Sequence, residues 1–392
     1  MKFRSVLIAR FLTAALIGGL VGGAGTARAV TYGDPVPNAN AAYPEVISLW
    51  TTDYYGELKH TCTATLIEQQ VAITAAHCLQ GDDAQRYVEV GATVLGEGRK
   101  IAVSSSWYNP RYSSSRIAND VGVVYLSEPA NVPIVARLKK LKTFTSKTKL
   151  EIAGWGVNQN GDPLTSLHRL SVKYDISRAK RWYGSSFNKK TTIAAGRYFR
   201  TEKVYGGACN GDSGGPLFSG RSAGSRSLVG IVSYGVRGCD ENAPTVFARV
   251  DYYWSALQTG IGYVKSEAAR ISGEIAANPL TASFLVTKPY SSLPYWQANV
   301  SASTYSKASI VKWCFFIDGR PITVAEVDYG SDEMPFSPSS DGCFVPTGYD
   351  SMKSGSVLFD FWSLSSGPHQ LTATVTDSLG RQVSTGVGSF VK

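Results

Sequence analysis

The sequence predicts an all-β protein that is divided into two folded domains. From Pro44 to about Val250, many short β-rich runs are separated by turns, a pattern typical of a β-barrel or a β-sandwich. Strand signals return in a different style after residue 278, and the chain of 392 residues is longer than one hydrophobic core usually supports. We expect a first domain over 30–265, a linker over 266–278 and a second domain over 279–392.

Residues 1–29 are predicted to form a secretory signal peptide. Basic residues near the start precede an apolar stretch from Phe11 to Val21, and small residues stand at Ala27 and Ala29. No stretch approaches the ~18 apolar residues of a membrane helix, so we expect a secreted, extracellular protein without a membrane span. The predicted signal peptide contains four Lys/Arg residues and no acidic residue, so its removal would lower the formal net charge from +9 to +5.

Seven runs in the first domain carry the strand signal, because β-branched and aromatic residues gather between turn residues. A helix is expected after Asp251, although Gly260 and Gly262 weaken its later turns. This helix would close the first domain. The expected strands cover 46–50, 71–74, 87–94, 120–126, 150–155, 227–234 and 245–250.

The second domain follows a polar stretch rich in Ala and Ser, which is the predicted linker. Residues 310–317 followed by Asp318-Gly319 predict a strand that enters a hairpin, and Leu371, Ala373 and Val375 alternate as in a second strand. A β-sandwich of about 110 residues fits this segment. We expect its many aromatic side chains mainly in the core, with a binding face as the alternative, and His369 in a loop.

Six cysteines in an exported chain suggest three disulfides. The sequence alone allows fifteen pairings, of which we prefer the local one. Metal binding is the alternative, but the chain lacks a CxxC motif and a Cys/His cluster, so we expect no metal and no cofactor. The preferred pairs are Cys62 with Cys78, Cys209 with Cys239, and Cys314 with Cys343.

The segment 211–216, Gly-Asp-Ser-Gly-Gly-Pro, presents a serine between small residues. Glycines allow a tight turn that aims backbone N–H groups at a carbonyl oxygen, which is the geometry of an oxyanion hole. Serine needs a base to remove its proton, and His77 lies beside a cysteine that could hold it in place. Asp120, between apolar residues, could orient the imidazole.

These three stretches, in the order His77, Asp120 and Ser213, resemble the trypsin/chymotrypsin family of serine proteases. Three further segments of this family have counterparts over about residues 30–260: the first-disulfide strand at 60–62, Gly-Trp-Gly at 154–156 and Ser-Tyr-Gly at 233–235. The resemblance implies a chymotrypsin-like double β-barrel with a C-terminal helix. It also implies a serine endopeptidase that acts on proteins or peptides through an acyl-enzyme.

The resemblance gives each site residue a role. Ser213 would be the nucleophile, His77 the general base and then acid, and Asp120 the orienting carboxylate. The N–H groups of Gly211 and Ser213 would bind the oxyanion. Extended substrate would pair with the backbone of residues 233–235, namely Ser233, Tyr234 and Gly235.

Family members become active when a new N-terminal amine pairs with the aspartate before the catalytic serine, here Asp212. The matching N-terminus is Val30, directly after the predicted signal-peptide site, so signal cleavage itself would create the activating amine. A cut after Ala27 is the alternative and would leave a two-residue pro-peptide. An unpaired Asp212 would be costly to bury.

The base of the specificity pocket should be Gly207, followed by Ala208, with walls at Gly235 and Thr245. A basic side chain would find no carboxylate there, so we expect cleavage after small to medium apolar residues. Asp240 and Glu241 at the pocket mouth could instead admit a basic residue.

The chain departs from the family pattern at Thr63 and Ala64, where glycines are usual, and in lacking a frequent third disulfide. Two basic stretches, 137–149 and 173–203, are expected to be solvated loops; the alternative is attraction to acidic substrates or an anionic cell surface. The absence of a recognised motif argues against nucleic acid as a partner.

Residues 367–380 resemble bacterial immunoglobulin-like modules, and this domain could bind substrate, a cell surface or a partner protein. The competing function is a binding or adhesion protein on a protease scaffold. Such proteins usually lose a triad residue, and none is lost here.

Overall fold

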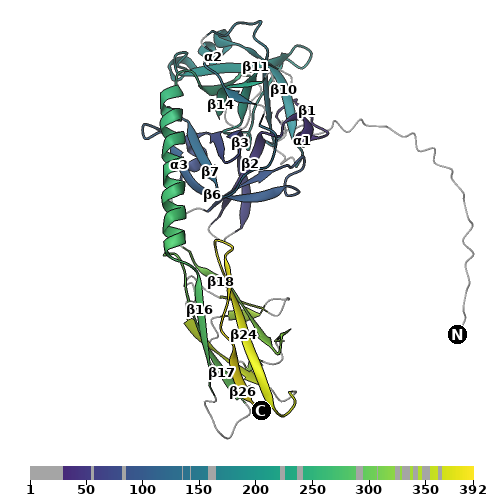
Figure 1. Ribbon diagram of the computed structural model, residues 1–392. Coiled ribbons are helices and arrows are strands. Elements are labelled where there is room, and N and C mark those ends of the chain that lie inside the picture. The colour runs from purple at the N-terminus through teal and green to yellow at the C-terminus, as the bar shows by residue number, and fades with distance from the viewer. Residues whose placement is uncertain are drawn as a thin grey trace, which may run out of the picture. The chain divides into compact units, whose positions relative to one another are not determined.

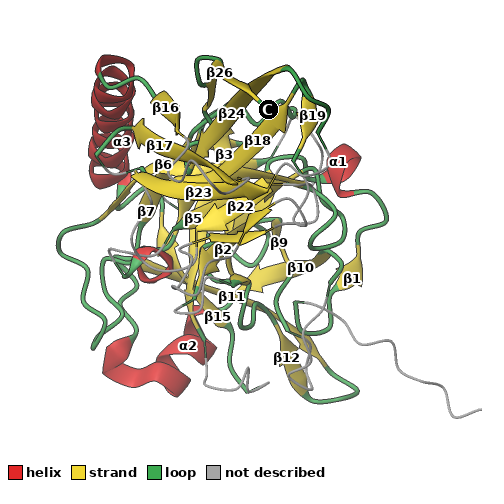
Figure 2. Cartoon of the chain, turned by 90° about the horizontal axis from the view of Figure 1, so that it is seen from below, coloured by secondary structure: helices red, strands yellow, loops and turns green. Residues whose placement is uncertain are grey.

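The computed structural model describes residues 30–53, 57–81, 85–134, 136–141, 143–157, 165–220, 226–235, 242–287, 295–306, 308–322, 327–328, 336–338, 343–346, 354–360 and 364–392. The chain divides into two compact units, Met1–Val264 and Lys265–Lys392. Strands dominate both units and helices are few, which bears out the all-β prediction (Figure 2).

The first barrel of the first unit is closed. Its strands follow the order β2-β3-β4-β7-β6-β5, and β5 pairs with β2 to complete the ring. These strands are purple to blue in Figure 1. Their bounds are β2 Val46–Thr52, β3 Leu58–Glu68, β4 Val71–Thr74, β5 Arg86–Val90, β6 Arg99–Tyr108 and β7 Gly122–Leu126.

The second barrel closes in the same way. Its order is β9-β13-β14-β15-β11-β10, and β10 pairs with β9. Three short strands attach at its margins: β1 Asp34–Pro35 on β10, β8 Arg137–Leu138 on β14, and β12 Val204–Gly206 on β11. The barrel strands are β9 Leu150–Gly154, β10 His168–Tyr174, β11 Thr192–Phe199, β13 Pro216–Ser219, β14 Ser227–Tyr234 and β15 Thr245–Arg249.

The two barrels are joined by buried residues of both. One hydrophobic cluster contains Ile47 and Leu66 from the first barrel and Phe218 and Ile231 from the second. A buried ion pair also crosses the junction, with Arg226 Nη2 3.0 Å from Glu45 Oε1. The chymotrypsin-like double barrel expected from the resemblance is thus the architecture of this unit.

Short helices flank the barrels: α1 Ala39–Ala42, the 3-10 turn η1 Ala76–Leu79, α2 Ile176–Tyr183 and the 3-10 turn η2 Gly184–Ser186. The long helix α3, Trp254–Ala277, is the expected helix after Asp251. It does not end at its glycines, and it runs through most of the expected linker 266–278. Ion pairs of Arg270 with Glu267 and Glu274, three and four residues away, support these added turns.

The second unit consists of two β-sheets. One has the order β16-β17-β23-β20, and the other has β21-β22-β18-β24-β25 with β19 on β18 and β26 on β24. The strands are β16 Thr281–Thr287, β17 Tyr295–Ser303, β18 Ile310–Ile317, β19 Arg320–Pro321, β20 Val327–Asp328, β21 Phe336–Pro338, β22 Cys343–Pro346, β23 Ser354–Asp360, β24 Pro368–Asp377, β25 Gln382–Ser384 and β26 Gly388–Val391.

The two sheets share one core, as in a β-sandwich. Val300 of β17 belongs to the same buried cluster as Trp313, Phe315 and Leu371 of the other sheet. Cys314 and Cys343 form a disulfide between paired strands β18 and β22. His369, expected in a loop, is instead a buried residue of β24, where its Nδ1 is 2.6 Å from Asp318 Oδ2.

No helix among the described residues has both the length and the apolar character that crossing a membrane requires.

Candidate active site

His77 and Asp120 are held at neighbouring ends of first-barrel elements. His77 lies in η1, directly after β4, and Asp120 lies two residues before β7. Strands β4 and β7 pair in register, with Thr74 opposite Gly122, so the two segments leave the barrel side by side. Asp120 is 1% exposed, which removes its carboxylate from water and makes its hydrogen-bond partners decisive.

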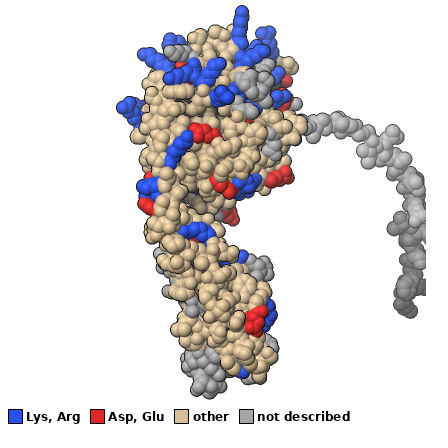
Figure 3. All heavy atoms as spheres, in the orientation of Figure 1, with Lys and Arg blue, Asp and Glu red and all other residues tan. Residues whose placement is uncertain are grey.

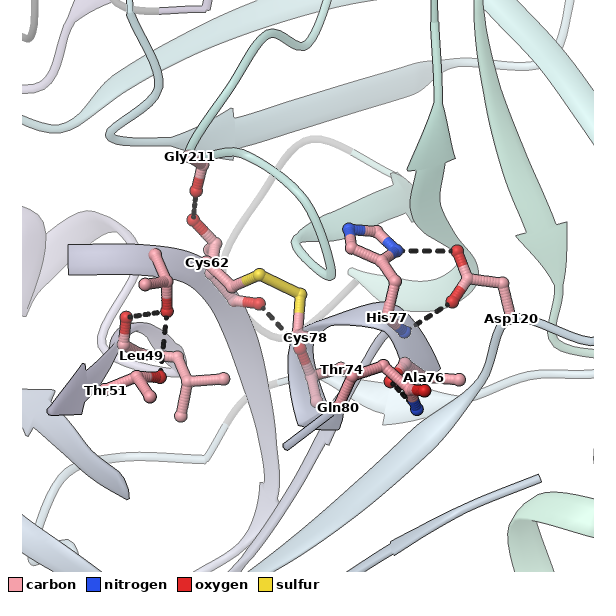
Figure 4. Close-up of a disulfide and its surroundings, with 12 residues drawn as sticks. Leu49, Thr51, Cys62, Thr74, Ala76, His77, Cys78, Gln80, Asp120 and Gly211 are labelled. Atoms are coloured by element: carbon pink, nitrogen blue, oxygen red, sulfur yellow. Dashed lines mark hydrogen bonds and ion pairs between the residues drawn. A yellow bond between two sulfur atoms is a disulfide. The ribbon is translucent and has the colours of Figure 1, made fainter. Parts of the chain in front are cut away.

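The Asp120 carboxylate fixes the His77 ring. Asp120 Oδ2 lies 2.9 Å from His77 Nδ1, and Oδ1 accepts a 2.9 Å hydrogen bond from the His77 backbone N–H (Figure 4). The Ser233 hydroxyl adds a third bond to the carboxylate, donating to Oδ2 at 2.6 Å. With Nδ1–H held by the carboxylate, Nε2 is the nitrogen left to accept a proton.

Ser213 meets His77 across one cavity. Ser213 lies in the turn between β12 and β13 of the second barrel, and it lines a cavity of about 450 Å³ together with His77 and Gly211. Gly211 and Gly214 have φ angles of 96° and 78°, which side chains rarely adopt. The turn therefore depends on both glycines for its shape.

The N–H groups of Gly211 and Ser213 have no acceptor among the described residues. The Asn210 carbonyl accepts a 2.8 Å bond from the Val157 N–H. Since the C=O and N–H of one trans peptide point in opposite directions, the Gly211 N–H points away from Val157. This leaves the N–H groups of Gly211 and Ser213 free to act as oxyanion donors.

Thr63 supports the turn that carries Ser213, a contact that sequence reasoning missed. Its hydroxyl donates to the Gly211 carbonyl at 2.8 Å, and its backbone N–H donates to the Ser213 carbonyl at 2.8 Å. A glycine at this position could make only the second of these bonds. The threonine at position 63, where the family usually has glycine, therefore ties the first barrel to the turn that carries Ser213.

Asp212, next to the serine, is completely buried beneath the Gly-Trp-Gly segment. Its carboxylate accepts bonds from the N–H groups of Gly156 at 2.8 Å and Cys209 at 2.9 Å. A Cβ at Gly154 or Gly156 would lie 2.2 or 2.3 Å from a carboxylate oxygen, so these glycines make room for the aspartate. Burial raises the pKa of Asp212 to about 7, because the two backbone bonds only partly offset the lost hydration.

Val30 is buried in the core of the second barrel with Leu150 and Ile152. It follows Ala29 in this chain and has no free amine, and none of the described residues brings a cation to Asp212. The next residue, Thr31, contacts the predicted pocket base: its hydroxyl donates to the Gly207 carbonyl and accepts from the Gly207 N–H. The sequence offered no sign of this contact.

Thr245 lies against the predicted base of the specificity pocket. Its hydroxyl accepts a 2.9 Å bond from the Ala208 N–H and lies 2.5 Å from the position of a Cβ on Gly207. Gly235 has open space where a Cβ would stand. Asp240 and Glu241, the alternative determinants, fall outside the described residues.

Cys62 and Cys78 form a disulfide with an S–S distance of 2.00 Å, which ties β3 to η1 beside His77 (Figure 4). Their sulfurs lie near His77, but a disulfide offers no thiolate to a metal. Cys209 is also disulfide-bonded; Cys239 lies outside the described residues, so its pairing with Cys209 stays a prediction.

The remaining histidines of the first unit have other surroundings. His60 lies with its Cε1 3.2 Å from the Cβ position of Gly211, and burial lowers its pKa to about 4. His168 is buried in β10, with Nδ1 2.9 Å from the Ser166 carbonyl oxygen. Only His77 faces Asp120 among the described histidines.

Known proteins match the part of the chain that carries this site. The family model described as Trypsin matches residues 36–257. The chain is 30% identical over 209 residues to Trypsin iota of Drosophila melanogaster, covering 51% of this chain and 79% of that protein. It is 34% identical over 196 residues to Trypsin theta of Drosophila erecta, covering 49% and 72% respectively.

A third relative has a longer chain. The protein is 30% identical over 240 residues to Transmembrane protease serine 11G of Mus musculus, which covers 58% of this chain and 55% of that protein. The chain spans about half the length of the transmembrane-protease relatives it matches.

Proposed function

This chain belongs to the trypsin family of serine proteases, and we propose that it is a secreted serine endopeptidase that works through His77, Asp120 and Ser213. The observation that carries the proposal is the chain of contacts Ser233–Asp120–His77 beside a cavity that His77 and Ser213 both line. This arrangement provides an oriented base at the same cavity as a serine whose turn also offers two N–H groups.

Each step of peptide hydrolysis has a group to perform it. Ser213 Oγ attacks the carbonyl carbon while its proton passes to His77 Nε2. The negative charge of the tetrahedral intermediate falls on the carbonyl oxygen, which the N–H groups of Gly211 and Ser213 stabilise. His77 then gives its proton to the leaving amine, which leaves an acyl-enzyme. Water, activated by His77, hydrolyses the ester and restores Ser213.

Asp120 contributes by holding His77 rather than by taking its proton. Three donors satisfy its carboxylate, namely the His77 N–H, the His77 ring and the Ser233 hydroxyl. Held in this way, the carboxylate keeps the imidazole in one orientation and stabilises the imidazolium that forms during the reaction.

The activating contact proposed for this protein joins the amine of Val30 to Asp212. An isolated carboxylate is costly to bury, as the pKa of Asp212 near 7 reflects. A positive amine beside it would favour the ionised form and fix the turn that carries Gly211 and Ser213. Removal of residues 1–29 as a signal peptide would supply that amine.

The proposed specificity is for small to medium apolar residues before the cleaved bond. The hydroxyl of Thr245 lies next to Gly207 and would make the pocket shallower. No carboxylate among the described residues 207–208 and 245 could pair with a basic substrate side chain. For the second unit we propose an immunoglobulin-like sandwich that binds substrate, a cell surface or a partner protein.

The test is hydrolysis of a peptide panel by the chain that begins at Val30, with the Ser213→Ala variant as its matched control. We expect the chain that begins at Val30 to cleave the peptides after Ala, Val or Leu. In the Ser213→Ala variant, kcat should fall by about 10⁶-fold. Fastest cleavage after Arg would contradict the specificity. Absence of any cleavage would favour a binding protein on a protease scaffold.

A further inference from the structure

A second cavity adjoins the triad on the side away from the Cys62–Cys78 disulfide. Its volume is about 280 Å³, and its lining includes Asp120, Ser233 and Tyr234. The remaining walls come from the loop before β7, the segment from η2 into β11, and Ala248 and Tyr253 in and after β15. Because Ser233 and Tyr234 belong to the segment proposed to pair with substrate, a side chain of that substrate can reach this cavity.

The cavity carries one cation, Arg116. This exposed residue lies in the loop between β6 and β7, and no hydrogen bond or ion pair joins its guanidinium to a described residue. The rest of the lining combines hydroxyl and amide groups, among them Ser186, Asn188 and Thr191, with apolar side chains such as Ile117 and the rings of Tyr234 and Tyr253. A guanidinium with five donors and uncharged polar neighbours suits an anionic oxygen ligand.

The one carboxylate in the lining, Asp120, forms no ion pair with this cation. It is 1% exposed, and both of its oxygens accept hydrogen bonds from His77 or Ser233. These donors hold the carboxylate within the triad, so it is not available to bind the Arg116 guanidinium. The neighbouring acid Asp251 forms an ion pair with Arg249, at 2.6 Å from Nη2 to Oδ2.

The wider surface at this end of the first unit is also basic. Lys189 and Lys190 follow Asn188 in the chain, and both are exposed. Figure 3 shows Lys and Arg side chains gathered on the part of this unit where α2 and β11 lie. A negatively charged substrate segment would meet an attractive field before it reaches the cavity.

We propose that this cavity binds the side chain of an Asp or Glu residue upstream of the cleaved bond, and that Arg116 selects it. The proposal rests on the proposed peptidase function and deepens it. In an extended substrate paired with residues 233–235, side chains point alternately to opposite faces, so one of them is directed toward Tyr234 and the cavity. The Arg116 guanidinium then donates to its carboxylate.

The test compares peptides that differ only in having Glu, Gln, Lys or Leu at one upstream position, scanned from the second to the fifth residue before the cleaved bond. We expect one position at which the native chain has a kcat/KM about tenfold higher for Glu than for Gln. This ratio should become smaller at high salt. Arg116→Gln should abolish that ratio, and Arg116→Glu should reverse it in favour of Lys. Arg111→Gln, in the same loop but outside the lining, is the matched control and should keep it.

Each outcome decides one claim. Equal rates for the Glu and Gln peptides at every position, or a Glu preference that survives Arg116→Gln, would overturn the acidic preference alone. Preference for an apolar residue at the responsive position would show that the rings of Tyr234 and Tyr253 govern the cavity instead. If neither the Glu nor the Gln peptides were cleaved by the native chain or by any variant, the peptidase function on which this site rests would be overturned.

Discussion

At the residue scale, the site depends on side chains whose hydrogen bonds join distant parts of the chain. Asp120 is bonded to Ser233 at 2.6 Å across 113 positions, and Thr63 is bonded to Gly211 at 2.8 Å across 148. The motifs around His77, Asp120 and Ser213 could be recognised locally. The supporting partners could not, because a hydroxyl residue in a strand has no local mark of the carboxylate or carbonyl it will meet.

Asp212 provides a prediction about pH. When residues precede Val30, burial raises the pKa of Asp212 from 3.8 to about 7, so the folded state holds a proton that the unfolded state has lost. Stability should therefore fall as pH rises from about 4 to about 7, by on the order of 4 kcal/mol. The measurement is urea unfolding across this range, made on the chain starting at Val30 and on the same chain extended by residues 24–29.

The chain starting at Val30 and the extended chain should differ in how their stability depends on pH. Pairing with the Val30 amine lowers the pKa of Asp212, so the fall in stability should shrink or disappear in the shorter chain. Asp212→Asn in the longer chain is the control and should remove the same dependence. An identical pH dependence in both chains would contradict the activating ion pair.

At the scale of elements, some segments were predictable and others were not. Strands β4, β14 and β18 have the bounds that their apolar runs indicate. Helix α2 was missed because its eight residues carry four polar or charged side chains and only a short apolar face. Its start could have been found at Asp175, whose side chain caps the helix by accepting a 2.9 Å bond from the Arg178 N–H.

Helix α3 shows why counting glycines misleads. The conformational cost of two glycines is about 2 kcal/mol, whereas Leu257, Ile261 and Val264 are all buried, each contributing about as much on its own. Gly260 also packs tightly: a Cβ there would lie 2.3 Å from Cε3 of Trp107. Gly262 has no atom within 4 Å of the corresponding position.

Alanine substitutions at these two glycines should therefore act in opposite directions. Gly262→Ala should stabilise the first unit by up to about 1 kcal/mol through helix propensity alone. Gly260→Ala should destabilise it by about 1 to 3 kcal/mol, because the methyl group forces the Trp107 ring to move. Thermal unfolding in a Ser213→Ala background, which prevents self-cleavage, measures both. A stabilising Gly260→Ala would show that α3 does not rest on Trp107.

At the scale of the whole molecule, the proposed reaction needs both barrels of the first unit. His77 and Asp120 come from the first barrel and Ser213 from the second, so the site exists only where the barrels meet. Buried polar contacts cross this junction: Arg226 pairs with Glu45, and the Tyr43 hydroxyl donates to Glu151 at 2.6 Å. Removing one member of such a buried pair would leave an uncompensated charge.

The double barrel was predictable because the segments around His77, Asp120 and Ser213 resemble those of a family with this fold, whereas the strand pattern alone indicates only a β-barrel or a β-sandwich. The second unit was predictable only as a sandwich, since alternation in residues 371–375 indicates a half-buried strand without naming a topology. Its charged contacts were not foreseen. Arg381, which bonds Asp377 and the carbonyl oxygens of Ile275 and Asn278, lies between β24 and β25, and nothing in its local sequence indicates these partners.

The most direct test of the account is covalent labelling of the chain beginning at Val30 with a serine-reactive organophosphate, followed by peptide mass mapping. One equivalent should attach to Ser213, none should attach to the Ser213→Ala variant, and Asp120→Asn should slow the labelling by about 10⁴-fold. Labelling of another residue, or none in the native chain, would contradict the proposal that His77 and Asp120 activate Ser213.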